Sequence, residues 1–65
     1  MNKILMLRKM NELGMSQKAL AEETGLTESA ISRYINGTRD PRLYNLIKIA
    51  DALEMTLDEL VREDK

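Results

Sequence analysis

Residues 16–37 constrain the fold of this chain more than any other stretch. Ser16 is a favourable N-cap, and it directly precedes a run of helix-forming residues over 17–24. Thr27 stands in the same way before a second run over 28–36. The side-chain oxygen of such an N-cap accepts a hydrogen bond from a backbone N–H that has no partner within the helix. The sequence therefore predicts two short helices separated by very few residues.

Small and apolar residues define how these two helices meet. Gly25 follows the first helix and adopts a positive φ at no steric cost, which so short a connection requires. Gly37 closes the second helix as a C′ glycine. Ala21 is small where the two axes would cross, and Ile31 and Tyr34 are expected to point back under the turn. The prediction is a close helix crossing around a tight turn.

A further helix is predicted on the N-terminal side of this pair, over residues 3–13. Asn2 can cap it, and Met6, Met10 and Leu13 form an apolar stripe at helical spacing. This helix is expected to contact a fifth, C-terminal helix.

Two more helices are predicted after residue 37. Asp40 can cap the first of them, with Pro41 as its opening residue, and Glu54 would end it in a mildly strained left-handed conformation. Thr56 and Glu59 form a capping box that starts the last helix, and residues 62–65 are expected to fray. The positions of the fourth helix expected to face the core are Leu43, Leu46, Ile49, Ala50 and Leu53.

The spacing of several residues resembles the lambda-repressor and Cro-like (XRE-type) helix-turn-helix family of transcriptional regulators. The resemblance rests first on Gln17, Ala21, Gly25, Ile31 and the Asn36-Gly37 ending. It extends over nearly the whole chain, because residues 41–42, 46–53 and 57–60 are similar to the family's fourth and fifth helices. The resemblance implies an all-α fold: a compact five-helix DNA-binding domain over residues 1–65, with the helix-turn-helix at its second and third helices.

Composition excludes several classes of function. The chain has no Cys and no His, so disulfides, thiolate or imidazole metal sites and imidazole catalysis are not available. With no phosphate-binding loop or evident carboxylate pair either, the sequence predicts no enzyme, no cofactor, no metal and no small-molecule ligand. Without a membrane-spanning run or a signal-peptide pattern, a cytoplasmic, nucleoid-associated protein is expected.

The charge of this chain is divided between its two ends. Residues 1–50 hold eight Lys and Arg against five Asp and Glu, whereas residues 51–65 hold two against six. The net charge of −1 is therefore a poor guide to DNA binding, which depends on the potential near the contact surface. We expect modest non-specific affinity for DNA.

The polar face of the helix over 28–36 is the candidate base-reading surface. Arg33 has the donor fork that matches guanine O6 and N7, and Glu28 can accept from cytosine N4. Ser29 and Ser32 are short enough to let the backbone approach the bases. Taken alone, these residues also fit an ordinary solvated helix face. The family resemblance implies the base-reading role for Glu28, Ser29, Ser32 and Arg33.

A second set of residues is expected to contact phosphates. Gln17 opens a helix whose free N–H groups and dipole suit an anion, and the family places a phosphate-contacting Gln there. The others lie at the ends of the base-reading helix or in the loop that follows it. The predicted set is Gln17, Thr27, Asn36, Thr38, Arg39 and Arg42.

The sequence thus predicts a double-stranded DNA-binding regulator, most simply a repressor that occupies an operator. The alternative is a protein-interaction module that keeps the fold, such as an antitoxin or an adaptor, because fold alone does not define function. A weak homodimer is also expected, since the family commonly binds two half-sites. Its interface would use the surplus apolar residues Ile4, Leu7, Leu57 and Val61.

Overall fold

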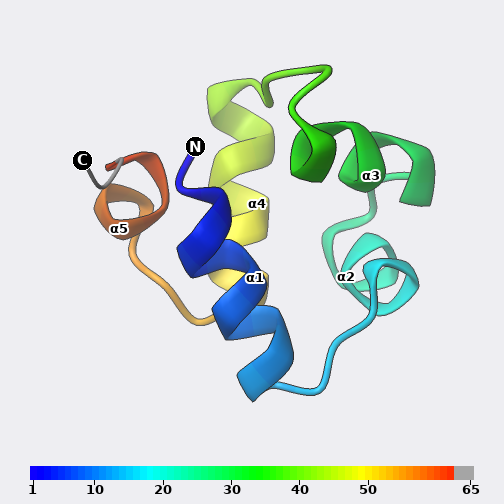
Figure 1. Ribbon diagram of the computed structural model, residues 1–65, viewed down its shortest axis with the longest axis horizontal. Coiled ribbons are helices and arrows are strands. Elements are labelled where there is room, and N and C mark those ends of the chain that lie inside the picture. Colours follow the sequence, from blue (N-terminus) through cyan, green and yellow to red (C-terminus); the bar gives the residue numbers. More distant parts are fainter. Residues whose placement is uncertain (63–65) are drawn as a thin grey trace.

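Five α-helices account for most of the chain in the computed structural model, which describes residues 1–62 (Figure 1). They are α1 Lys3–Glu12, α2 Gln17–Thr24, α3 Glu28–Asn36, α4 Leu43–Ala52 and α5 Leu57–Val61. No strand occurs between residues 1 and 62, so the predicted all-α fold is confirmed. Of the end that was expected to fray, residues 63–65 lie outside the described residues.

Side-chain caps begin four of the five helices, as the sequence predicts. The side-chain oxygen of Asn2 accepts from the Leu5 N–H at 3.1 Å, and those of Ser16 and Thr27 accept from the third residue on at 3.0 Å each. At α5, Thr56 and Glu59 exchange hydrogen bonds in a complete capping box. Each cap supplies an acceptor to a backbone donor that the helix itself leaves unpaired.

The start of α4 differs from the prediction. The helix begins at Leu43, and Arg42 occupies the N-cap position without a side-chain cap. The N–H of Arg39 bonds back to the carbonyl of Arg33 at 3.3 Å, so the turn that ends α3 continues through residue 39. The next residues must then cross to α4, and Arg42 is extended (φ −72°, ψ 161°). A helix starting at Pro41 is therefore wrong.

Two apolar residues at helix ends also lie outside the core. Leu43 is 61% exposed because it opens α4, and the expectation that it faces the core is wrong. Leu13 follows the end of α1 as its C-cap and is 37% exposed, so only Met6 and Met10 of the expected stripe are buried.

The hydrophobic core lies between the helices, with contributions from all five. In Figure 1, α1 lies in front of α4 at the centre, α5 lies on one side, and α2 and α3 lie on the other. The predicted contact between α1 and α5 is confirmed, and the N–H of Asn2 also donates to the carbonyl of Leu60 at 2.6 Å. The buried apolar residues are Met6, Met10, Leu20, Ala21, Ile31, Tyr34, Ile49, Ala50, Leu53, Met55 and Leu60.

Left-handed residues close the helices where the sequence predicts them. Gly25 has φ +74° and Gly37 has φ +78°. Glu54 adopts φ +56°, the one such residue within 1–62 that is not glycine, and Met55 after it donates to the carbonyl of Ala50 at 2.9 Å. None of the described helices is long and apolar enough to cross a membrane.

Candidate nucleic-acid interface

Buried side chains hold α2 and α3 against each other at the turn. Leu20 and Ala21 of α2 and Ile31 and Tyr34 of α3 all belong to the core. Ala21 is 6% exposed, which agrees with the need for a small residue where the helices approach each other. The relative orientation of α2 and α3 is therefore set by close packing.

A buried threonine ties the end of α2 to the turn. The Thr24 hydroxyl donates to the carbonyl of Leu20 at 2.8 Å and also lies 3.2 Å from that of Ala21. Its oxygen accepts from the N–H of Leu26, on the far side of Gly25, at 3.3 Å. One side chain thus links the last turn of α2 to the segment that leads into α3.

A second polar contact fixes α3 to α4. The side-chain amide of Asn45 donates to the hydroxyl of Tyr34 at 3.0 Å, in a partly buried position. Tyr34 therefore contributes its ring to the core and its hydroxyl to a bond between helices. Such a bond restricts rotation of α3 about its own axis.

The outward face of α3 carries the four residues that the sequence predicts to read bases. Helical positions 28, 29, 32, 33 and 36 fall within an arc of about 140°, opposite the buried Ile31 and Tyr34. Glu28, Ser29 and Arg33 are exposed and Ser32 is half-buried. The structure thus brings these side chains together on one accessible surface.

Two residues expected to contact phosphate lie near the N-terminal ends of α2 and α3. Gln17 is the first residue of α2 and is half-buried. Thr27 caps α3: its oxygen accepts from Ala30 N–H at 3.0 Å, which leaves the hydroxyl proton as a donor. Each of these two positive helix N-termini is thus accompanied by a side chain that can donate a hydrogen bond.

A compact turn follows the other end of α3. The side-chain oxygen of Asn36 accepts from the backbone N–H of Thr38 at 3.2 Å and from its hydroxyl at 2.8 Å. The carbonyl of Arg33 accepts from the N–H groups of Thr38 and Arg39 at 3.1 and 3.3 Å. Asn36, Thr38 and Arg39 are therefore held together by local bonds and remain exposed. Arg42, at the start of α4, is exposed as well.

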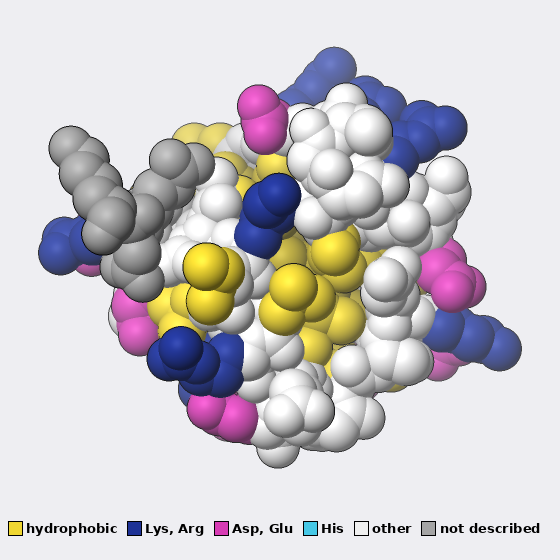
Figure 2. Space-filling model, viewed as in Figure 1, with side chains coloured by type: hydrophobic (Ala, Val, Ile, Leu, Met, Phe, Trp, Pro, Cys, Tyr) yellow, Lys and Arg dark blue, Asp and Glu magenta, His cyan; other side chains and the backbone are white. Residues whose placement is uncertain are grey.

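The acidic side chains of α5 lie away from the outward face of α3. Figure 2 shows Lys and Arg side chains over the α3–α4 loop, at the edge where α3 lies. The acidic residues Asp58 and Glu59 belong to α5, at the opposite edge in Figure 1. The fold thus places Asp58 and Glu59 away from the outward face of α3.

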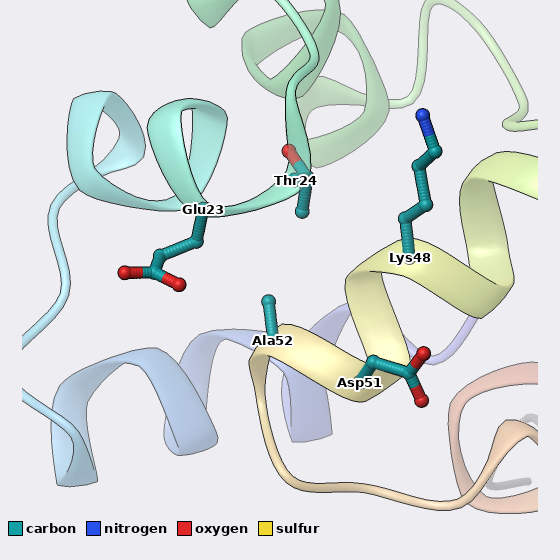
Figure 3. Close-up of a pocket in the computed structure, with 5 residues that line it drawn as sticks. All are labelled: Glu23, Thr24, Lys48, Asp51 and Ala52. Carbon is teal, nitrogen blue, oxygen red and sulfur yellow. The ribbon is translucent and has the colours of Figure 1, made fainter.

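An open cleft of about 410 Å³ lies elsewhere, between the end of α2 and α4 (Figure 3). Glu23, Thr24, Lys48, Asp51 and Ala52 line it, and their charged groups point in different directions. Within residues 1–62, no three acidic, Cys or His side chains are grouped in a way that would hold a metal ion. We assign no ligand to this cleft.

Three residues that support this region were not predicted from the sequence. The Thr24 bond has a local signal, since a Thr in the last turn of a helix commonly bonds to the carbonyl four residues back. The bond from Asn45 to Tyr34 and the approach of Lys3 to Gly37 join different helices. No local pattern reports such contacts.

Two short helices crossing at a tight turn, the second with an exposed polar face, define a helix-turn-helix domain. The chain belongs to the helix-turn-helix family, whose model matches residues 4–60. The predicted resemblance to the XRE-type members of this family is confirmed.

Curated relatives share this region with the chain. The chain is 40% identical over 48 residues to the cryptic phage CTXphi transcriptional repressor RstR of Vibrio cholerae. The aligned segment covers 74% of this chain and 43% of the repressor. It is 41% identical over 51 residues to a replication factor C small subunit of Thermococcus kodakarensis, 78% of this chain and 6% of that protein. The chain therefore spans less than half the length of these relatives. No solved structure matches it significantly.

Proposed function

We propose that this protein binds double-stranded DNA in a sequence-specific manner and represses transcription by occupying an operator. The observation that carries the proposal is the outward face of α3, where Glu28, Ser29, Ser32 and Arg33 lie together and accessible. Membership of the helix-turn-helix family and similarity to a phage transcriptional repressor support it. Such a protein acts where the DNA is, at the nucleoid in the cytoplasm.

In this proposal α3 enters the major groove. Arg33 is one turn into the helix and donates to the O6 and N7 atoms of a guanine, while Glu28 accepts from a cytosine N4. Ser29 and Ser32 allow close approach of the helix to the base edges. The packing of Ile31 and Tyr34 holds this face outward, so little conformational freedom is lost on binding.

Phosphate contacts on both sides of α3 supply affinity and register. Gln17 and Thr27 meet one stretch of backbone, and Asn36, Thr38, Arg39 and Arg42 meet another. The turn at residues 36–39 is fixed by its own hydrogen bonds, which supports a preorganised contact. Repression then follows from steric exclusion of the transcription machinery at an overlapping promoter.

The test separates the two arginine roles. Selection from random duplex DNA first identifies the preferred site, and affinity is then measured against salt on this duplex and on a scrambled one. Arg33→Ala should cost about 1–3 kcal/mol on the preferred site and relax preference at one base pair, with little change on scrambled DNA. Arg39→Ala should weaken both duplexes and lower the salt slope by about one unit.

Arg62→Ala serves as the matched control, because Arg62 pairs with Asp58 at 3.0 Å beside α5, away from α3. It should leave affinity for both duplexes unchanged. If Arg33→Ala weakens both duplexes equally, Arg33 does not read a base. If the parent protein binds neither duplex, the DNA-binding proposal fails and the alternative of a protein-interaction module replaces it.

We further propose that the protein forms a weak homodimer through α1 and α5. Ile4 is 68% exposed and Leu7 44%, and Val61 of the adjoining α5 is 42% exposed. Leu57 lies half-buried at the start of α5. Figure 2 shows hydrophobic side chains on the face where α1 lies in front. Two subunits would read two half-sites, which a single α3 cannot do.

Sedimentation of the complex at a selected site tests the assembly. The expected stoichiometry is two chains per duplex on a palindromic site, and Ile4→Glu should reduce it to one. Leu43→Glu is the matched control, because Leu43 is similarly exposed but lies on α4. One chain per duplex on a non-palindromic site contradicts the dimer and leaves the DNA-binding proposal intact.

A further inference from the structure

The side chain of Lys3 lies against the C-terminal end of α3. Lys3 is the first residue of α1, so the sequence places it far from the helix-turn-helix. Its ammonium nitrogen is nevertheless 3.4 Å from the position that a Cβ on Gly37 would occupy. Gly37 ends α3 and immediately precedes Thr38 and Arg39. The fold therefore brings a cation from α1 to the turn that follows the recognition surface.

This cation has no carboxylate partner within residues 1–62. The ion pairs between described side chains join Lys9 to Glu12 and Arg62 to Asp58, and neither involves Lys3. Lys3 is also exposed, so its charge acts on the solvent beside Gly37. An ammonium without a carboxylate partner, next to a turn that carries the exposed Arg39, is suited to an anion.

We infer that Lys3 is an additional phosphate-contacting residue of the DNA interface, an inference that rests on the proposed DNA-binding function. The adjacent turn is held in one conformation by local hydrogen bonds. Thr38 donates to the side-chain oxygen of Asn36, and the N–H of Arg39 donates to the carbonyl of Arg33. Lys3 adds a flexible point charge next to this rigid group. A DNA backbone passing the end of α3 would meet both Arg39 and Lys3.

A purely structural role for Lys3 gives different results. A cation near the carbonyl end of α3 also interacts favourably with the helix dipole, and this effect requires no DNA. Loss of that effect lowers the melting temperature of the free protein and leaves the number of neutralised phosphates unchanged. Loss of a phosphate contact lowers the dependence of affinity on salt.

The experiment compares Lys3→Gln with Lys9→Gln on the selected and scrambled duplexes. The two variants remove the same charge from the same helix, but Lys9 is paired with Glu12 at 3.7 Å. Lys3→Gln should weaken both duplexes and reduce the salt slope by about one unit, and Lys3→Arg should restore it. Lys9→Gln should keep the parent slope.

Two outcomes overturn the inference while the protein still binds DNA. An unchanged salt slope in Lys3→Gln, with or without a lower melting temperature, removes Lys3 from the interface. An equal fall of the slope in Lys9→Gln shows a general effect of net charge and no contact at Lys3. If the parent binds neither duplex, the proposed function itself has failed, and this inference fails with it.

Discussion

Gly25→Ala tests the turn on which the orientation of α3 depends. Gly25 has φ +74° and ψ 11°, a left-handed conformation that costs an L-residue roughly 1–2 kcal/mol. Apart from its neighbours in the chain, a Cβ added there has no heavy atom within 4 Å, so the structure predicts no steric clash and no gain in packing. The backbone conformation is therefore the main source of destabilisation.

The expected net loss is smaller than this conformational cost alone. Alanine also restricts the unfolded chain, which offsets roughly 0.4–1 kcal/mol. The remaining loss in the free energy of unfolding is about 1 kcal/mol. In a domain of this size, such a change lowers the melting temperature by roughly 4–8 °C.

Thermal and urea unfolding, followed by far-UV circular dichroism, measure this loss. Glu54→Gly provides the reverse variant, because Glu54 is exposed and already adopts φ +56°. It should raise the melting temperature, because the relief of left-handed strain exceeds the entropic cost of glycine.

Either of two results would refute this reasoning. If Gly25→Ala melts at the temperature of the parent, the turn does not depend on a left-handed residue at position 25. If it loses more than about 3 kcal/mol, the added methyl group must collide with packed atoms, contrary to the open space at this position.

Two further predictions concern hydrogen bonds at helix ends. Thr24→Val should destabilise the fold by about 1–2 kcal/mol, because it leaves the partly buried N–H of Leu26 without its acceptor. Thr24→Ser keeps the hydroxyl and should retain most of the stability. Urea unfolding of both variants measures the difference. The hydrogen bonds from the backbone and side chain of Thr56 hold the pKa of Glu59 below its ordinary value of 4.5. The folded state therefore binds this proton less readily, so the stabilisation is present above pH 4.5 and is lost as pH falls through the lowered pKa. On acidification, the melting temperature of Glu59→Gln should fall less steeply than that of the parent, because Gln keeps an acceptor but does not titrate. Identical profiles of melting temperature against pH would contradict this role of Glu59.

Much of the helix-turn-helix could be predicted from the sequence because its determinants act over short distances. Ser16 and Thr27 bond to backbone groups three residues away, and Gly25 and Gly37 act through their own φ angles. The outward position of Arg33 follows from helical periodicity once Ile31 is buried. The start of α4 was mispredicted, because Arg39 bonds back to the carbonyl of Arg33 and extends the preceding turn.

Only the tertiary structure decided which distant residues surround the recognition surface. Asn45 bonds to Tyr34 from another helix, and Lys3 reaches Gly37 from the start of α1. The placement of α5 at the edge opposite α3 likewise keeps Asp58 and Glu59 away from the outward face of α3. Helix caps and periodicity specify each helix along its own axis. The approach of one helix to another depends on how all five bury a shared core, and that arrangement is settled only when the whole chain packs.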